Sequence, residues 1–508
     1  MKKILALILA SLTAFSMASC AGPATSSGST SAAGSAANSK GSASGGPVKV
    51  QIALPSMNNL PGDKAKQAVN DALSKYVQSK GYNIAVDVEP SSFTDYTTNM
   101  NMRLAGNEVL DIVYTGPINT AVSNGYLVNL DQYKGNELAG AMKIIGNWYL
   151  CGMVKGSLYG IPAYNGLALD YKYIYNQDYF KDFDMTAVKS VEDLDGLFAK
   201  FKKKYPKELP AANAYNTCLQ LYSEEDHTST IGSYFATVGD STKLVNLYAT
   251  DAYKKSCDTA YRWRKLGYVD PEGSAQTVGH DAFTYSGACK GVIMGHAYSI
   301  DTVEQMFTMN NNYRAKFKAI SLAHTGLSTS GLTYGIAYTS KHPKEAAQLL
   351  NLIWTDPYVM STIVYGLEGV SWEWKSDKSS IKYPNGLGLD KVPYTCLYSC
   401  GAFGNQFLLY GMDGNTSNAD KAYMKNLLNK AFVPQLFGFT PSADKFATQV
   451  AAISNVVNQY DKALRYGDVD PSTKLPEFLS ALKSAGIEDV MVDYQKQADD
   501  WTAQYKKK

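Results

Sequence analysis

The sequence lacks the features that identify several common classes of protein. After its N-terminal segment it has no run of about eighteen apolar residues, the length at which a transmembrane helix becomes a candidate. Its charge is nearly balanced, with 48 Lys and Arg against 46 Asp and Glu, and the positive residues form no stripe. Nucleic acid is therefore not expected as a partner, because its binding depends on a clustered positive surface.

Familiar catalytic motifs are also missing. There is no GxSxG nucleophile turn, no HExxH zinc site and no GxxxxGK[ST] phosphate loop. DGNTSNAD, residues 413–420, resembles a calcium loop but has Asn418 where glycine is required. The acidic cluster at residues 224–227 is more typical of a solvated turn than of a metal or acid–base site. We expect no catalytic group, metal or cofactor, although paired carboxylates for glycoside hydrolysis have no sequence signature.

Cysteine is scarce, and no pair has CxxC spacing. In an exported protein an even number of cysteines can form disulfides, but a chain of this size does not need them to fold. Disulfides and free buried thiols are therefore both open. Zinc is not expected, because no histidine lies near a cysteine pair at ligand spacing. The cysteines other than Cys20 are Cys151, Cys218, Cys257, Cys289, Cys396 and Cys400.

What is present begins with an export signal at residues 1–20. Two lysines precede ILALILASLTAF, an apolar run too short to span a bilayer. The sequence MASC that ends at Cys20 resembles the lipobox of bacterial lipoproteins. That resemblance implies that Cys20 is diacylated at sulphur and becomes the new N-terminus. An ordinary signal peptide that contains a cysteine is the alternative.

A linker follows the signal. Residues 21–47 are almost all Ser, Gly, Ala and Thr, with one charge at Lys40. Such a composition buries too little apolar surface to fold, so we predict a flexible tether that reaches roughly 30 Å. A lipid on Cys20 would thus anchor a folded domain at the extracellular face of the cell membrane.

The chain from residue 48 onward is too long for one hydrophobic core. Apolar residues alternate in the strand-like segments 48–56 and 83–90, and the segment 63–81 between them has the three-to-four spacing of a helix. Alternating strands and helices indicate βαβ units and a parallel sheet covered on both faces. From residue 444 to the C-terminus the spacing predicts helices.

Three blocks of sequence resemble family 1 extracellular solute-binding proteins of ABC importers. GSLYGIP (156–162) leads into a Tyr-rich β segment, and residues 334–369 resemble the stretch where a strand re-enters the first lobe and two helices follow. YGDVDPSTKLPEFLSALKSAGIEDVMVDYQKQADDW (466–501) resembles the C-terminal domain of a lipoprotein subgroup of this family. The resemblance implies a two-lobed, periplasmic-binding-protein-like α/β fold, each lobe a mostly parallel sheet flanked by helices, with a helical C-terminal region.

The same resemblance implies a division and a function. Residues 48–162 and 328–370 would form lobe 1, and residues 163–327 and 371–508 would form lobe 2 with the helical C-terminal region. A monomer would bind a solute between the lobes and deliver it to the transmembrane subunits of an ABC permease. We expect an oligosaccharide or sugar derivative. The alternatives are a peptide-binding receptor, a surface-anchored glycan-degrading enzyme and a non-transporting adhesin or sensor.

Candidate ligand contacts lie in loops that follow the strands, where open parallel sheets bind their ligands. Sugar rings stack their C–H faces on Trp and Tyr, and sugar hydroxyls suit amides and carboxylates. Trp148, in contrast, is expected to fill the core. The predicted contacts are Asn58, Tyr114, Thr115, Tyr164, Asn165, His296, Tyr298, Glu368, Trp372 and Trp374.

Overall fold

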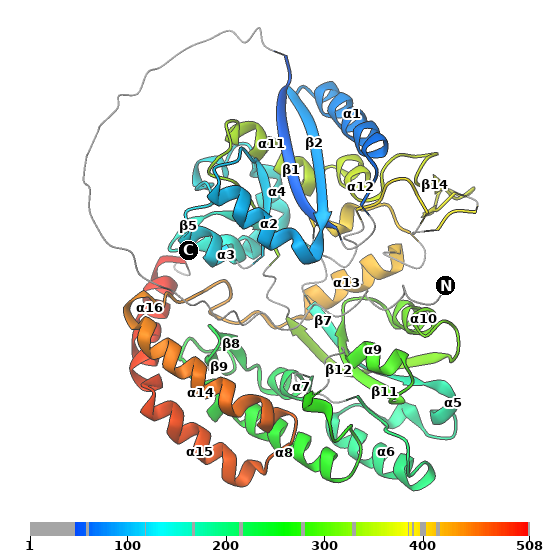
Figure 1. Ribbon diagram of the computed structural model, residues 1–508, viewed down its shortest axis with the longest axis vertical. Coiled ribbons are helices and arrows are strands. Elements are labelled where there is room, and N and C mark those ends of the chain that lie inside the picture. The colour runs from blue at the N-terminus through cyan, green and yellow to red at the C-terminus, as the bar shows by residue number, and fades with distance from the viewer. Residues whose placement is uncertain are drawn as a thin grey trace.

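A computed structural model of the protein describes most of the chain after the linker (Figure 1). The predictions for Cys20, Asn58 and Asn165 lie outside the described residues. Within those residues, no helix combines the length and the apolar character needed to cross a membrane. The described residues are 46–56, 60–116, 118–164, 168–212, 217–275, 280–327, 332–384, 386–388, 391–396, 403–412 and 417–505.

The first lobe is built on a 5-stranded sheet with the order β2-β1-β3-β13-β6. β1 pairs in parallel with β2 and β3, whereas β13 is antiparallel to both β3 and β6. The strands are β1 (Val48–Ser56), β2 (Ile84–Ser92), β3 (Ile112–Gly116), β6 (Gly160–Pro162) and β13 (Thr333–Ile336). The helices around this sheet are α1 (Asp63–Ser79), α2 (Phe93–Ala105), α3 (Ile118–Ser123), α4 (Ala139–Ile145), α11 (Pro343–Thr355) and α12 (Pro357–Tyr365).

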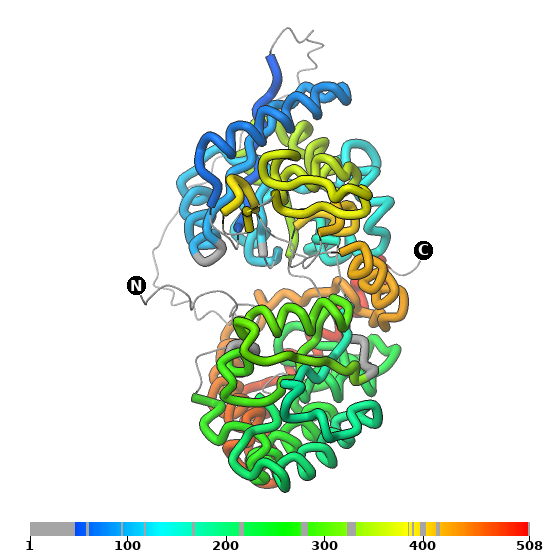
Figure 2. Tube along the Cα trace, turned by 90° about the vertical axis from the view of Figure 1, so that its right-hand side faces the viewer, coloured from blue at the N-terminus to red at the C-terminus, as the bar shows by residue number. Residues whose placement is uncertain are grey.

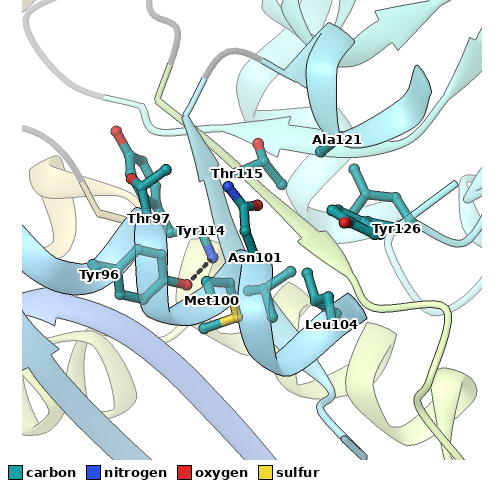
Figure 3. Close-up of a pocket in the computed structure, with 11 residues that line it drawn as sticks. Tyr96, Thr97, Met100, Asn101, Leu104, Tyr114, Thr115, Ala121 and Tyr126 are labelled. Carbon is teal, nitrogen blue, oxygen red and sulfur yellow. Dashed lines mark hydrogen bonds between the residues drawn. The ribbon is translucent and has the colours of Figure 1, made fainter. Parts of the chain in front are cut away.

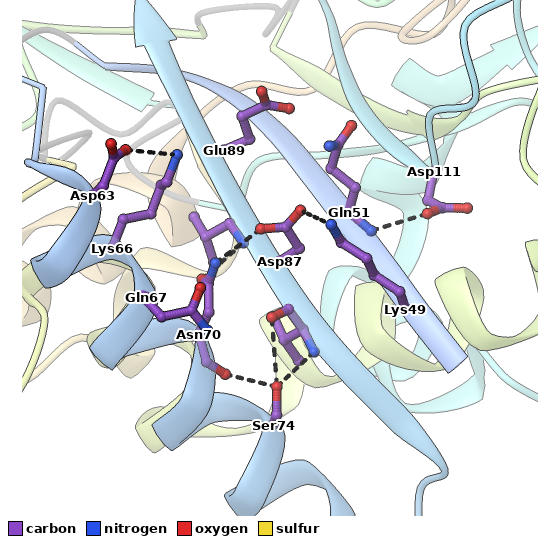
Figure 4. A network of polar contacts seen from close by, with 12 residues as sticks. Lys49, Gln51, Asp63, Lys66, Gln67, Asn70, Ser74, Asp87, Glu89 and Asp111 are labelled. Carbon is purple, nitrogen blue, oxygen red and sulfur yellow. Dashed lines mark hydrogen bonds and ion pairs between the residues drawn. The ribbon is translucent and has the colours of Figure 1, made fainter. Parts of the chain in front are cut away.

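β2 is an edge strand of this sheet, and a row of polar side chains on α1 covers its outer edge. Asn70, Ser74 and Gln78 lie four residues apart and therefore share one face of the helix. The backbone N–H of Val88 donates to Asn70 Oδ1 at 2.9 Å, and that of Val86 donates to Ser74 Oγ at 2.8 Å (Figure 4). Gln78 Nε2 donates to a carbonyl oxygen of the same strand at 3.0 Å. These bonds satisfy backbone groups that an edge strand would otherwise leave open to another chain.

The second lobe differs from the expectation of a mostly parallel sheet. Its 3-stranded sheet has the order β11-β7-β12, and both described pairings are antiparallel. β7 (Ala168–Asn176) lies between β11 (Gly291–His296) and β12 (Phe317–Leu327), which α10 (Ile300–Asn310) connects as a crossover. Sequence periodicity does not show that a third strand inserts between two others, because strand pairing depends on contacts between distant segments.

The C-terminal helices belong to the second lobe. Ile453, Phe478 and Val490 pack in the same core as Phe198 and Trp263. The helices are α5 (Gln177–Phe180), α6 (Val191–Lys204), α7 (Thr217–Asp226), α8 (Asp251–Lys265), α9 (His280–Tyr285), α13 (Asn418–Lys430), α14 (Ala447–Arg465), α15 (Pro471–Ser484) and α16 (Ile487–Tyr505). Figure 1 shows α14 and α15 beside α8 in the lower body of the molecule, and the tube in Figure 2 shows the same two bodies from the side.

The remaining strands are short. The segment that contains two of them, residues 371–412, changes the expected division between the lobes. Residues 371–412, assigned to lobe 2 by the sequence, contribute Trp372, Tyr394 and Met412 to the core of the first lobe. Strands of two residues carry too little periodicity to reveal this return. The short strands are β4 (Met153–Val154), β5 (Ser157–Leu158), β8 (Ser229–Ile231), β9 (Phe235–Thr237), β10 (Val245–Asn246), β14 (Glu373–Trp374) and β15 (Ile381–Lys382).

The cysteines that the structure describes are free thiols. Burial raises the pKa of each of them, to about 12 for Cys151 and Cys396, so they stay protonated at neutral pH. The sequence left disulfides and free thiols open, and for these residues the structure shows thiols. Cys400 lies outside the described residues.

Candidate functional site

A pocket lies at the carboxyl end of β3 in the first lobe (Figure 3). Its volume is about 30 Å³, and its mouth is open to solvent. Side chains from α2, β3 and α3 surround it. It contains the predicted residues Tyr114 and Thr115. Its lining is Tyr96, Thr97, Met100, Asn101, Leu104, Val113, Tyr114, Thr115, Ala121, Tyr126 and Leu127.

The aromatic wall of the pocket is fixed by a buried tyrosine. The hydroxyl of Tyr96 accepts a hydrogen bond from the backbone N–H of Tyr114 and donates one to the carbonyl oxygen of Ala53, both at 2.9 Å. Burial raises the pKa of Tyr96 far above its ordinary value, so the phenol keeps the proton that it donates. The ring of Tyr114 contacts that of Tyr96 edge-on, with centroids 5.7 Å apart. The backbone of Tyr114 is therefore hydrogen-bonded to Tyr96, and its ring packs between those of Tyr96 and Tyr334.

The polar side of the pocket comes from threonine and asparagine. Thr115 Oγ1 donates to the carbonyl oxygen of Thr333 on β13 at 3.1 Å, and the two hydroxyl oxygens lie 2.5 Å apart. Thr97 and Asn101 are exposed, four residues apart on α2, and both line the pocket. Hydroxyl and amide groups beside tyrosine rings suit a ligand with hydroxyl groups and C–H faces.

In the second lobe, a buried ion pair lies in the first half of β7, the strand that follows the crossover from the first lobe. Lys172 Nζ is 2.9 Å from the carboxylate of Asp170, and neither side chain is more than 5% exposed. Asp170 also accepts hydrogen bonds from Ser321 on β12 and Tyr423 on α13. Burial lowers the pKa of Lys172, and the charge of Asp170 opposes that effect. The pair fastens α13 to the sheet.

His296 ends β11 beside this ion pair. Burial and the charge of Lys172 lower the pKa of His296 to about 4, with Asp170 opposing, so the imidazole is neutral at physiological pH. Its Nε2 atom is buried and has no hydrogen-bond partner among the described residues. Burial raises the pKa of Tyr365 on α12, with smaller contributions from Tyr383 and Tyr298.

The other predicted residues are not brought into the pocket. Trp372 is 4% exposed, and its Nε1 donates to the carbonyl oxygen of Gly366 at 2.9 Å, so its ring is core and offers no face to a ligand. Trp374 is half-buried against Trp372, and Glu368 is exposed. Tyr164 is fixed at the crossover, where its ring meets Phe407 edge-on.

The sequence did not predict several residues of the first-lobe pocket, nor the buried ion pair of the second lobe. Tyr96 and Asn101 lie on the helix α2, whereas the predicted contacts lie in loops after strands. The four-residue spacing of Thr97 and Asn101 was the available signal. Asp170 and Lys172 lie two residues apart in a strand otherwise rich in tyrosine, which places both charges on one face of the sheet. Their pairing depends on burial, which spacing does not report.

The acidic cluster after Tyr222 differs from the predicted solvated turn at one position. Glu224 is half-buried at the end of α7, and burial, with a contribution from Asp226, raises the pKa of its carboxyl to about 7. Asp226 instead accepts hydrogen bonds from Thr228, and the ring of His227 stacks on Phe432 at 4.2 Å. No three His, Cys, Asp or Glu residues in the described part of the chain are grouped to hold a metal ion.

The segment that resembled a calcium loop contains a helix start. Ser417 and Asp420 form a capping box at the first turn of α13. Asp420 is fully buried and also accepts hydrogen bonds from the backbone N–H and the hydroxyl of Ser299, at 3.0 and 2.8 Å. Its carboxylate therefore joins the start of α13 to that of α10. Residues 413–416 lie outside the described part of the chain.

Comparison with solved structures shows the fold. The N-glycan transport solute binding protein (NgtS) of Streptococcus pneumoniae has a TM-score of 0.75 at 21% identity, over 89% of this chain and 98% of that one. An HMO binding, ABC-transporter associated solute binding protein of Bifidobacterium longum infantis has a TM-score of 0.60 at 14% identity, over 90% and 99%. The predicted two-lobed α/β solute-binding fold is confirmed.

Comparison by sequence shows the family. A carbohydrate ABC transporter substrate-binding protein of Streptococcus pneumoniae serotype 4 is 25% identical over 423 residues, which cover 82% of this chain and 84% of the relative. These relatives are substrate-binding proteins, not enzymes. A domain of unknown function, DUF3502, matches residues 435–503. The family model for bacterial extracellular solute-binding proteins matches residues 59–360, more than half of the chain. The chain belongs to the bacterial extracellular solute-binding protein family.

Proposed function

We propose that this protein captures an oligosaccharide outside the cell and delivers it to the transmembrane subunits of an ABC importer. The observation that carries the proposal is the pocket of the first lobe, where the ring of Tyr114 packs edge-on against Tyr96 and the exposed Asn101 lines the same pocket. Rigid aromatic faces with adjacent polar groups suit sugar rings, and a receptor needs no catalytic group. The carbohydrate-binding relatives support the same ligand class.

We place the first-lobe contacts at Tyr114, Thr115, Asn101 and Tyr126. The second-lobe contacts that we propose are His296, which ends β11 and whose Nε2 has no hydrogen-bond partner among the described residues, and Tyr298 in the loop that follows. A hinge movement about the crossovers would close these groups around the solute. Tyr164, Trp374 and Glu368, and Asn58 and Asn165 beyond the described residues, stay predictions.

Ligand-dependent unfolding tests the function. The chain from residue 21 onward is heated with oligosaccharides, monosaccharides and peptides, and each sample is analysed for products. A ligand at a thousand times its Kd adds about 4 kcal/mol to the free energy of unfolding, which raises the midpoint by degrees. An intact oligosaccharide that raises the midpoint supports the proposal. A peptide that does so would make the protein a peptide receptor, and degraded glycan would make it an enzyme.

Substitutions in the pocket test the site. Tyr126→Ala should weaken binding by about 1–3 kcal/mol, because a large apolar face is lost from the contact. Tyr313→Ala is the matched control, since this tyrosine is 72% exposed on a turn of the second lobe. Equal affinities of the two variants would remove the pocket from the binding site.

The anchor is a separate part of the proposal. We propose that Cys20 carries the lipid and that residues 21–47 tether the folded lobes to the membrane. Cys20→Ser should release the protein into the medium without changing its affinity for the solute. A variant that stays bound to the membrane with no lipid attached would contradict the anchor.

A further inference from the structure

The two lobes meet at a second place besides the chain crossovers. In the first lobe, the surface is formed by the 3₁₀ helix Gly146–Gly152 and the turn that follows it. The ring of Trp148 meets Phe437 edge-on, with centroids 4.8 Å apart. Gly438 adopts φ +84, and a Cβ atom there would lie 2.5 Å from Leu150 Cβ. The two backbones approach so closely that only glycine fits.

The C-terminal end of α16 also contacts the first lobe. Tyr505, at the end of α16, packs against the core of the first lobe. Burial raises the pKa of its phenol, and Asp131 and Tyr149 of the first lobe contribute. A Cβ atom at Gly156 would lie 2.8 Å from the Tyr505 hydroxyl, so this glycine also leaves room for the partner. The hydroxyl is buried without a hydrogen-bond partner in the described part of the chain.

The rest of α16 is fixed in the other lobe. Ile487, Val490 and Tyr494 are buried in the core of the second lobe. A row of rings then leads toward the first lobe, since Phe439 contacts Trp501 at 5.9 Å and Trp501 contacts Tyr505 at 5.5 Å. One rigid helix therefore has its base in one core and its tip on the other.

Charge contributes little to this contact. Lys155 Nζ lies 3.2 Å from Asp444, but the two side chains are 68% and 82% exposed, and pairs of that kind are weak. The interface depends on the packing of Trp148, Phe437, Leu150 and Tyr505. Packed apolar contacts hold one arrangement, because small displacements lose many of them together.

We infer that the C-terminal region, which matches a domain of unknown function, is an interlobe brace. Its base moves with the second lobe and its tip bears on the 3₁₀ helix of the first, so it sets the angle between the lobes in the absence of ligand. The consequence for solute affinity rests on the proposed function. If the two lobes close around a solute, that movement must either keep this contact or break it. The effect on the lobe angle does not depend on any ligand.

The test compares three α16 variants of the protein from residue 21 onward. Small-angle scattering gives the radius of gyration without ligand, and hydrogen exchange reports the protection of residues 146–158. Tyr505→Ala should change the radius and raise exchange in that segment several-fold. Tyr505→Phe should match the wild type, because the hydroxyl has no partner to lose. Val492 lies on the same helix and is 71% exposed, so Val492→Ala is the control for general damage to α16.

Trp148→Ala approaches the same interface from the first lobe. It should reproduce the changes in radius and exchange, and combining it with Tyr505→Ala should add less than the sum of the two. If both single variants keep the wild-type radius and exchange, the brace is overturned. If they change both while no oligosaccharide binds even the wild type, the brace stands and the proposed function falls.

Discussion

The two lobes place their strongest polar interactions in different surroundings. In the first lobe, neutral polar side chains cover a sheet edge, and other polar side chains line a pocket that is open to solvent. In the second, the Asp170–Lys172 pair is buried inside the lobe and ties α13 to the sheet. Removing one member of a buried charge pair leaves the other charge uncompensated, whereas removing one partner of a neutral hydrogen bond costs less. The lobes should therefore differ in their tolerance of substitution.

The largest effect is expected from Asp170→Asn. The change leaves the ammonium group of Lys172 buried without a counter-charge and should lower the free energy of unfolding by about 3–5 kcal/mol. Denaturant unfolding measures this loss. The double variant Asp170→Asn, Lys172→Met removes both charges and should recover part of the stability. A loss below about 1 kcal/mol for the single variant would end the contrast between the lobes.

The edge of the first lobe should show a smaller effect. Asn70→Ala removes the acceptor for the Val88 N–H and the donor to Asp87. We expect a loss of about 1–3 kcal/mol in the free energy of unfolding, the cost of leaving a buried donor without a partner. Gln67→Ala, on the exposed part of the same helix, is the matched control and should cost less than about 0.5 kcal/mol. Equal losses would mean that the row of polar side chains on α1 adds nothing to the edge.

A pH titration sharpens the comparison within the second lobe. The folded state raises the pKa of Glu224 from 4.5 to about 7, so the stability it contributes is complete below pH 4.5 and is lost as the pH rises through 7. Glu224→Gln is neutral throughout. Its advantage in unfolding free energy over the wild type should be near zero in acid and reach about 1–2 kcal/mol at about pH 8, reduced by partial solvation.

The control for that titration is the neighbouring, exposed Glu225. Glu225→Gln removes the same charge from the surface of α7. If the difference in unfolding free energy between Glu224→Gln and the wild type does not change with pH, burial does not raise the pKa of Glu224.

The smallest effect is expected at the surface pair of the first lobe. Lys49 Nζ lies 2.8 Å from Asp87, but its side chain is 71% exposed (Figure 4). Lys49→Met should change the free energy of unfolding by less than about 1 kcal/mol, and less again at high salt. A loss comparable with that of Asp170→Asn would show that burial does not distinguish the two pairs.

Local pattern predicted much of the first lobe. The alternation of residues 48–56 predicts β1, and Gly81, with φ +90, follows the end of α1 as the sequence indicates. Their position after the third predicted strand predicted Tyr114 and Thr115 as contacts, and both line the pocket. In the Trp-rich segment near residue 372, composition alone does not separate an aromatic residue that stacks on a ligand from one that fills a core.

The sequence by itself determined the strand–helix alternation of the first residues after the linker, the helical C-terminal region and the need for more than one core, because these follow from periodicity and length. It indicated the family through the resemblance of three sequence blocks. Tertiary structure alone decided that β7 runs antiparallel between two strands, that residues 371–412 return to the first core, and that Tyr505 reaches across to the other lobe. Each of these depends on contacts between segments far apart in the chain. Such contacts are selected by burial and shape, and neither has a period along the sequence.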